Sequence, residues 1–399
     1  MQVLKKVILI LVVMTITICD MSCDIYTPSL PKISDFFNVK HAIAQLTVSL
    51  NLIGGSLSGL LYGPLSDYYG RRPIMLIGIA IFGLASIGCC FVNNIVMLII
   101  MRLIQGCGAG VAGVIGYAVI NDMFSGSEEC AKNISYVNMA IAFSPAIGPI
   151  LGSSIISHGY DWNVLFMVIS VLSVILFIFL YIYLKETIVT WHKDSLNFYY
   201  VVKKYVNLMV NMRFLGFALI YSLTIMWVWA SIVNLPFVFI KSMNLPIGNY
   251  GYLIAIHVIS YVIGTIINQR LVERVGMNRM LIMGLLLDFI PDIIVVIFHY
   301  AIKLTPLLIE LIWIPSGIGI AFTISNSMAS AFKEIQDSGT GSAFIVFLQT
   351  FFGALGIYIV ECFSDGTIIA IAILPIICSI VSIVIYTTLR VTRKEKYIE

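Results

Sequence analysis

Three charged residues stand inside long apolar runs in the N-terminal half of the sequence: Arg102, Asp20 and Asp24. The two aspartates are four residues apart, so they share one face of a helix. If these runs cross a membrane, an arginine at the centre costs about 2.5–3.5 kcal/mol to insert, so Arg102 must face a wet cavity or a carboxylate. A carboxylate beside Arg102 stays ionised until a proton or a cationic ligand competes for it. The pattern predicts a proton-binding site, and a purely structural salt bridge is the alternative.

Other kinds of chemistry have no support in the sequence. It contains no GxxxxGK[ST] nucleotide-binding loop. The five histidines and eight cysteines lack metal-ligand spacing, and Cys19, Cys23, Cys89 and Cys90 lie in apolar runs that are typical of packing residues. We therefore expect no metal, no cofactor and no structural disulfide. The net charge of +3 is too small to indicate a nucleic-acid partner.

The elements that must position the charged residues are membrane helices. Of the 399 residues, 60% are hydrophobic and 11% are charged, whereas soluble domains have about 45–50% and about 25%. This composition excludes a soluble enzyme, a disordered scaffold and a nucleic-acid-binding protein. The apolar run from Val7 to Cys19 continues without a cleavage site, so it predicts a first span rather than a removed signal peptide.

Twelve segments are long and apolar enough to cross a bilayer, which needs about 20 residues each. Charges, Gly/Pro clusters and Asn pairs separate the segments. We expect spans at 6–27, 44–64, 74–93, 95–120, 133–156, 164–184, 213–238, 249–270, 279–300, 304–326, 339–360 and 366–389.

A charged segment at 185–212 divides these spans into two groups of six. We therefore expect an N-terminal six-helix bundle at 1–184, a linker at 185–212 with an amphipathic helix near 196–210, and a C-terminal six-helix bundle at 213–399. If the N-terminus is cytoplasmic, 18 of the 23 Lys and Arg residues fall on the cytoplasmic side. Because positive charge favours that side, both termini and the linker are predicted to be cytoplasmic.

The most specific string in the chain is GPLSDYYGRRP, from Gly63 to Pro73. Gly63 would permit close helix approach, and Gly70 suits a position with positive φ. Asp67 can hydrogen-bond helix ends, while Arg71 and Arg72 can anchor to anionic lipids and nearby carboxylates. The simplest interpretation is a tight turn with cytoplasmic positive charge. That interpretation explains the arginines but not the whole ordered set.

The spacing of this loop recurs once. Leu65, Asp67 and Gly70 have counterparts 206 residues later, after span 8: Leu271, Glu273 and Gly276. Both copies follow the second span of a six-span half, which favours a duplicated architecture.

The fifth predicted span contains prolines and glycines at close spacing: Pro145, Gly148, Pro149 and Gly152. Prolines bend a helix, and glycines let a neighbouring helix pack closely.

Four strings together carry a family resemblance. The loop at 63–73 resembles the loop 2–3 signature of the major facilitator superfamily, and RLIQGCGAG at 102–110 resembles its span 4 motif. SPAIGPILGS at 144–153 resembles the GPxxGG motif of drug:proton antiporters, with Ser153 in place of the last glycine. DIYTPSLP at 24–31 resembles the signature of the bicyclomycin-resistance (Bcr/CflA) subfamily. The C-terminal half matches mainly by span count and by the weaker loop copy, in which Met277 and Asn278 replace the arginines.

The resemblance implies an all-α membrane protein with 12 transmembrane helices in two six-helix bundles, the major facilitator fold. It implies a monomeric multidrug efflux transporter of the inner membrane that exchanges small amphipathic compounds for protons. It favours Asp24 over Asp20 as the partner of Arg102, assigns a conformational switch to the loop at 63–73, and assigns a pathway seal to the span 5 motif. The alternatives are a proton-coupled metabolite uptake symporter of the same fold and a membrane sensor without transport activity.

Other residues at membrane depth are harder to assign. Tyr26, Trp227 and Trp229 are candidates to line a substrate cavity, although ordinary helix packing is the alternative. Asp288 and Asp292 flank Pro291 in span 9 and favour a structural or water-facing role.

Overall fold

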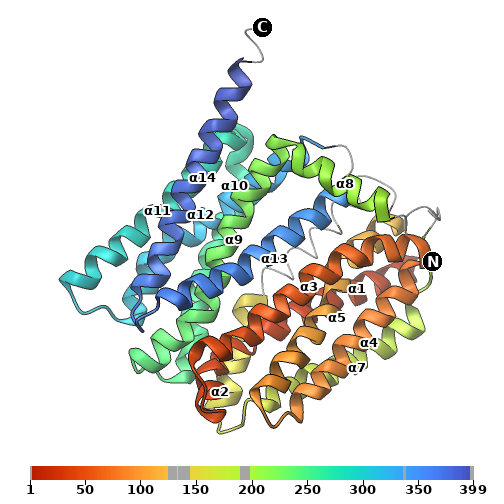
Figure 1. Ribbon diagram of the computed structural model, residues 1–399, viewed down its shortest axis with the longest axis horizontal. Coiled ribbons are helices and arrows are strands. Elements are labelled where there is room, and N and C mark those ends of the chain that lie inside the picture. Colours follow the sequence, from red (N-terminus) through yellow and green to blue (C-terminus); the bar gives the residue numbers. More distant parts are fainter. Residues whose placement is uncertain (1, 125–132, 134–143, 189–197, 336–337, 396–399) are drawn as a thin grey trace. The chain divides into compact units, whose positions relative to one another are not determined.

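The structure is a computed structural model of the chain, and it describes residues 2–124, 133, 144–188, 198–335 and 338–395 (Figure 1). Within these ranges the regular elements are helices, and eleven of them are long and apolar enough to cross a membrane. Part of the predicted span at 133–156, residues 134–143, lies outside the described residues. The chain divides into two compact units, Met1–Lys203 and Lys204–Glu399. The boundary falls within the segment expected to be a linker.

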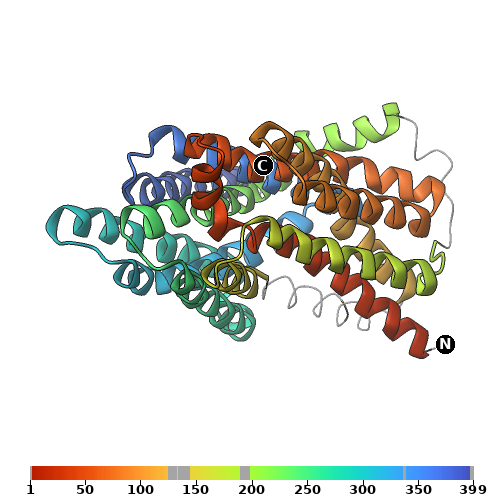
Figure 2. The same cartoon turned by 90° about the horizontal axis from the view of Figure 1, so that it is seen from below.

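The first unit is a bundle built mainly of long helices. Its elements are α1 (Gln2–Asp24), the short η1 (Thr27–Ser29) and α2 (Leu30–Phe36), and then α3 (His41–Tyr69), α4 (Arg71–Cys90), α5 (Ile95–Met123) and α7 (Asn163–Tyr183). Residues 144–157 are also helical. α5 packs against both α3 and α4, and α4 packs against α7, which runs alongside it in Figure 1 and Figure 2. The Gly-rich sequence of α5 permits this, because an added Cβ at Gly106 would collide with the main-chain oxygen of Asn51 on α3.

The second unit has the same kind of construction. Its elements are α9 (Met212–Pro236), η3 (Phe237–Ser242), α10 (Ile247–Val275), α11 (Met277–Ala301), α12 (Pro306–Phe332), α13 (Ser338–Phe363) and α14 (Ile369–Glu395). α12 packs against α9, α10 and α11, and α13 packs against α9. The fold class predicted from the sequence is confirmed.

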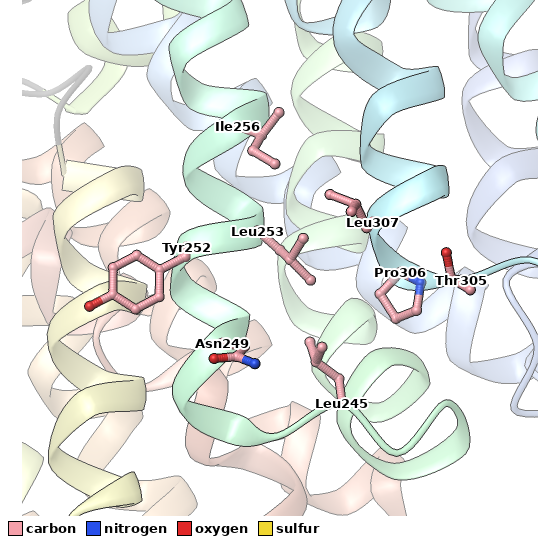
Figure 3. Close-up of a pocket in the computed structure, with 8 residues that line it drawn as sticks. All are labelled: Leu245, Asn249, Tyr252, Leu253, Ile256, Thr305, Pro306 and Leu307. Carbon is pink, nitrogen blue, oxygen red and sulfur yellow. The ribbon is translucent and has the colours of Figure 1, made fainter.

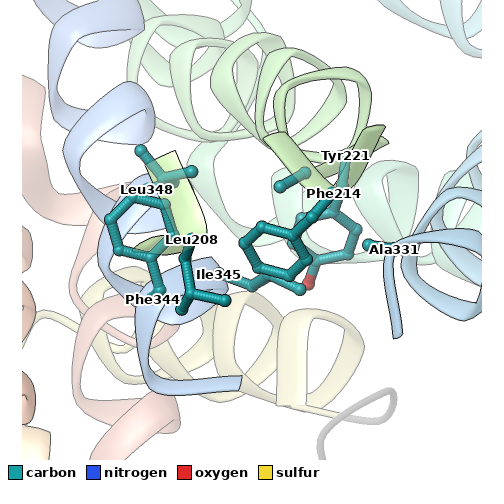
Figure 4. Close-up of a cluster of buried hydrophobic side chains, with 8 residues drawn as sticks. Leu208, Phe214, Tyr221, Ala331, Phe344, Ile345 and Leu348 are labelled. Carbon is teal, nitrogen blue, oxygen red and sulfur yellow. The ribbon is translucent and has the colours of Figure 1, made fainter. Parts of the chain in front are cut away.

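Helix α8 (Phe198–Val210) lies where the amphipathic helix was expected, and its second half belongs to the second unit. Leu208 joins a buried cluster with Phe214 of α9, Ala331 of α12, and Phe344 and Ile345 of α13 (Figure 4). Each of these five side chains is buried. The end of α8 is therefore fixed to the second unit by apolar burial.

The first span differs from its predicted form. α1 ends at Asp24, but helical structure resumes at Thr27 and continues through α2 to Phe36. Pro28 and Pro31 each stand in the first turn of the helix that they begin, where the missing N–H costs nothing. The string at 24–31 therefore joins two helices instead of ending one.

Candidate functional site

Arg102 lies on α5 and is completely buried. Its guanidinium donates hydrogen bonds from Nε to Thr47 O at 3.2 Å, and from Nη1 to Gln105 Oε1 at 2.5 Å and Ser22 O at 3.4 Å. Nη2 lies 3.3 Å from the Cys23 sulfur. All of these acceptors are neutral. Arg102 thus ties α1 to α3 and α5 through backbone carbonyls, an amide and a thiol.

Aromatic rings complete the surroundings of the guanidinium. The carbon Cζ of Arg102 lies 4.8 Å from the ring centre of Tyr26 and 5.7 Å from that of Phe166. Both distances fit cation–π contacts. Tyr26 is fully buried, and its hydroxyl is 2.9 Å from Thr47 Oγ1. In this structure Tyr26 therefore covers the arginine and lines no open cavity.

Further polar residues around Arg102 were missed from the sequence. The amide Nδ2 of Asn51 donates to Arg102 O at 2.9 Å, and Cys23 Sγ donates to Asn51 Oδ1 at 3.1 Å. Gln105 Nε2 donates to Ser86 Oγ at 2.7 Å. Asn51 and Gln105 could have been found in the sequence as amide side chains within apolar spans, since a buried amide must find a hydrogen-bond partner.

Asp24 faces a different neighbour. It is 4% exposed, and its Oδ2 accepts a hydrogen bond of 2.7 Å from Ser144 Oγ. An added Cβ at Gly148 would lie 2.5 Å from Asp24 Cβ, and one at Gly152 would collide with Ile25 O. The close packing expected of these two glycines is therefore present, and it seats the helix at 144–157 against the end of α1.

The expected ion pair between Asp24 and Arg102 is absent from the interactions of the described residues. The reason is the helix geometry of α1. Ser22 and Cys23 carry the contacts to Arg102, while Asp24 follows about 100° further around the helix and points to Ser144. Asp20 lies one turn before Asp24, and its side chain is exposed. The shared face predicted for the two aspartates thus runs from an exposed carboxyl to a buried one.

The loop at 63–73 forms a charge network around Arg71. Arg71 Nη1 lies 2.6 Å from Asp67 Oδ1 and donates to Ser66 Oγ at 2.6 Å, and Nε lies 3.1 Å from Asp122 Oδ2. Gly70 has φ 104°, as its type predicted. Gly63 was expected to allow close helix approach, but an added Cβ there would lie 3.9 Å from Val114 Cγ1, an ordinary contact. That expectation is wrong in this structure.

A carboxylate from the end of the sixth span completes this loop. Glu186 accepts hydrogen bonds from the backbone N–H groups of Arg71 at 2.9 Å and Arg72 at 3.2 Å. These are unpaired donors of the first turn of α4. Arg72 Nε donates to Leu184 O at 2.7 Å, and Nη2 donates to Tyr181 O at 2.9 Å. The loop therefore binds α4 to the chain that leaves α7.

The tryptophans predicted to line a cavity lie in the second unit. Trp227 of α9 is 5% exposed. Trp229 is half-buried and packs on α13, where an added Cβ at Gly353 would lie 2.8 Å from Trp229 Cδ1. A pocket of about 390 Å³ opens elsewhere in this unit, with Leu253 and Leu307 among its lining residues (Figure 3). Neither tryptophan lines this pocket.

The sequence profile of the Major Facilitator Superfamily matches residues 11–357. The chain belongs to the major facilitator superfamily. It is thus a multi-pass membrane transporter and not an enzyme.

Relatives and solved structures agree with this assignment. A bicyclomycin resistance protein homolog of Haemophilus influenzae is 25% identical over 340 residues, which cover 83% of each chain. The chloramphenicol resistance protein CraA of Acinetobacter baumannii is 26% identical over 341 residues, covering 83% of this chain and 80% of the relative. The xylose transporter XylE from E. coli has the same fold, with a TM-score of 0.72 and 14% identity over 94% of this chain and 95% of the other. The resemblance to the bicyclomycin-resistance type is confirmed, and such relatives indicate an inner-membrane protein.

Proposed function

We propose that this transporter exports small amphipathic toxic compounds of the bicyclomycin and chloramphenicol kind in exchange for protons. The substrate class is supported by the names of the two resistance proteins to which the chain is similar over most of its length. In the proposed arrangement a single copy of the chain lies in the inner membrane with both termini in the cytoplasm. The excess of Lys and Arg on that side supports the orientation.

The observation that carries proton exchange is the contact between Asp24 and Ser144. Asp24 is buried where α1 meets the helix at 144–157, and the Ser144 hydroxyl is its hydrogen-bond donor. Protonation of Asp24 removes the negative charge to which this hydroxyl donates its hydrogen bond. The packing of the two helices therefore differs in free energy between the protonated and ionised forms, and such differential binding is what lets a proton shift a conformational equilibrium.

Asp20 and Arg102 have supporting roles in this proposal. Asp20 lies one turn before Asp24 on the same face of α1, so it offers a second carboxyl for the proton. Arg102 holds α1, α3 and α5 together through neutral acceptors. When these helices separate in another state of the cycle, the guanidinium loses those acceptors and becomes available to a carboxylate of α1.

The test compares carboxyl variants in an efflux-deficient host and in inverted membrane vesicles. Asp24→Asn should abolish proton-driven efflux while drug binding to the purified protein persists, and Asp20→Asn should have a smaller effect. Asp365→Asn is the matched control, because Asp365 is exposed and, among the described residues, its hydrogen bonds come from Thr367 of the same loop.

Each other outcome has a definite meaning. Full efflux by Asp24→Asn together with loss in Asp20→Asn would transfer the role to Asp20. Normal efflux by both variants would show that the carboxyl groups of α1 do not couple transport to protons. If deletion of the transporter changes susceptibility to no compound in a drug panel, the export proposal fails.

A further inference from the structure

Among its described residues the second unit has three buried carboxyl groups at membrane depth: Asp288 and Asp292 on α11, and Glu310 on α12. Each is 1% exposed. Among the described residues none of the three has a Lys or Arg partner. Asp288 Oδ1, Asp292 Oδ2 and both Glu310 oxygens also lack a hydrogen-bond partner. Burying a charge without a partner is energetically unfavourable, so the ionised form of these carboxyl groups would destabilise the fold.

The two aspartates lie one turn apart and face α12. Trp313 Nε1 donates to Asp292 Oδ1 at 2.9 Å, and Thr323 Oγ1 approaches Asp288 Oδ2 at 3.5 Å. An added Cβ at Gly319 would lie 2.5 Å from Asp288 Oδ1, so the α12 backbone closes this side of the site. We call this contact between α11 and α12 the acidic seam.

An independent polar group also points into the seam. Ser316 of α12 is 1% exposed and lies beside Asp288, and its hydroxyl makes no hydrogen bond of standard geometry. A hydroxyl can accept the O–H of a neutral carboxyl group or donate to an ionised one. Asp288 Oδ1 and Asp292 Oδ2, which have no donor among the described residues, suit an added hydrogen.

Among the described residues no Lys or Arg forms an ion pair with the seam. At membrane depth the helices packed against α11 carry these titratable groups: Glu310 on α12, Tyr250, His257 and Tyr261 on α10, and Cys378 and Tyr386 on α14. The basic residues of these helices stand in the last two turns: Arg270 and Arg274 on α10, and Arg390, Arg393 and Lys394 on α14. His257 is a weak candidate for a cation, because its ring is enclosed and its Nδ1 has no partner. Two ionised aspartates four residues apart would repel each other in this setting.

We propose that Asp288 and Asp292 form a proton-binding site in the acidic seam, separate from the carboxyl groups of α1. In the state described here the seam holds at least one proton, with Trp313 and Thr323 as donors to the carboxyl oxygens and Ser316 as an acceptor. The proton is taken from water and returned to it, so no other reactant is needed.

Glu310 gives this site a direction of access. It lies four residues after the start of α12, about 6 Å along the axis at 1.5 Å per residue. Trp313 and Ser316 follow at one-turn intervals toward Asp288. Leu307, one turn before Glu310, lines the open pocket at this end of α10 and α12 (Figure 3). This row of polar groups leads from the end of the unit that carries the α11–α12 loop toward the seam, and it is the access route that the proposal assigns to protons.

The experiment uses the purified full-length transporter in detergent, without drug. Infrared spectroscopy should show the carbonyl stretch of protonated carboxyl groups at neutral pH, and alkaline titration should release the corresponding protons. Asp288→Asn/Asp292→Asn should weaken this infrared band, to which Glu310 and Asp24 can still contribute, and should release one to two fewer protons per molecule. Asp365→Asn should match the parent protein. An unchanged band and unchanged proton release in the double variant would overturn the proposal.

Further variants keep the test decisive if the double variant fails to fold. Each single Asn variant should lose part of the signal, while Asp288→Glu and Asp292→Glu should restore a protonated band with a shifted frequency. A structural role alone would change thermal stability without changing the number of bound protons. Because no substrate is present, the result stands even if the proposed drug export is wrong. If that export is right, loss of the seam should also lower the number of protons exchanged per drug molecule.

Discussion

The two loops that follow α3 and α10 have the same backbone turn and different side chains. Gly70 has φ 104° and ψ 154°, and Gly276 has φ 88° and ψ 145°; each separates two long helices. Around Gly70, Arg71 joins Asp67 and Asp122, and Glu186 accepts from the start of α4. The second loop has Met277 and Asn278 in place of the arginines, and Lys333 Nζ lies 3.2 Å from Met277 Sδ.

This difference distinguishes two structural requirements that occur together in the string at 63–73. The glycine serves the turn, since both loops have it with nearly the same dihedral angles. The two arginines after the glycine stand in the first loop and not in the second. We expect them to control the conformational cycle, and exchanging features between the loops tests this role.

The largest effect is expected from giving the first loop the residues of the second. Arg71→Met/Arg72→Asn removes the charge network and leaves Asp67 and Asp122 without a cation. Hydrogen bonds to charged groups contribute about 1.5–3 kcal/mol each, so the initial rate of proton-driven efflux in vesicles should fall at least about tenfold. The reciprocal Met277→Arg/Asn278→Arg should stay within about twofold of the parent. Equal losses in both variants would show that the loops do not differ in function.

The glycines should respond alike. Gly70→Ala and Gly276→Ala place a side chain in a backbone region that is almost restricted to glycine, at a cost of about 1–3 kcal/mol each. The midpoint of thermal unfolding in detergent should fall by similar amounts in both. Gly113→Ala in α5 is the control, because an added Cβ there meets nothing within 4 Å. A large effect at only one of the two loops would contradict a shared turn requirement.

Asp67→Asn should lower efflux by up to about tenfold, which is about 1.4 kcal/mol, with expression near normal. The amide can still accept a hydrogen bond from Arg71, but the charge is lost. Glu273→Gln is the matched change in the second loop, where the side chain is exposed, and it should have little effect. Wild-type efflux by Asp67→Asn would show that the first loop acts only as a turn between two helices.

The smallest effect is expected at Glu186. Glu186→Gln keeps an acceptor for the first N–H groups of α4 but removes a negative charge from its N-terminus, which contributes about 0.3–1 kcal/mol. Denaturant unfolding in detergent should show a decrease of that size, and added salt should reduce it. No decrease at low salt would show that the contact is incidental.

The sequence predicts the fold well because hydropathy and helix length determine it almost locally. Eleven expected spans have counterparts among the described helices, and the positive φ of Gly70 follows from its residue type. The restart of helical structure at Thr27 was missed, because proline in a short apolar segment is compatible with both a helix end and a helix start.

The site was less predictable than the fold. Spacing shows that Asp20 and Asp24 share a face, but it does not show which neighbouring helix that face meets. Asp24 meets Ser144, while Arg102 meets the carbonyl of Ser22 on another side of α1. The predicted ion pair between Asp24 and Arg102 rested on their similar depth in the membrane, and it is not formed. A buried arginine can be satisfied by neutral acceptors and aromatic rings.

One consequence of the Arg102 cluster concerns how its opening can be observed. The Cys23 thiol is buried 3.3 Å from the guanidinium and donates to Asn51, whereas Cys362 on α13 is exposed. A membrane-permeant alkylating reagent should therefore modify Cys362 at once and Cys23 only in molecules whose α1, α3 and α5 have parted. The rate of Cys23 alkylation thus reports how often these helices separate, and the rate of Cys362 alkylation serves as the internal reference.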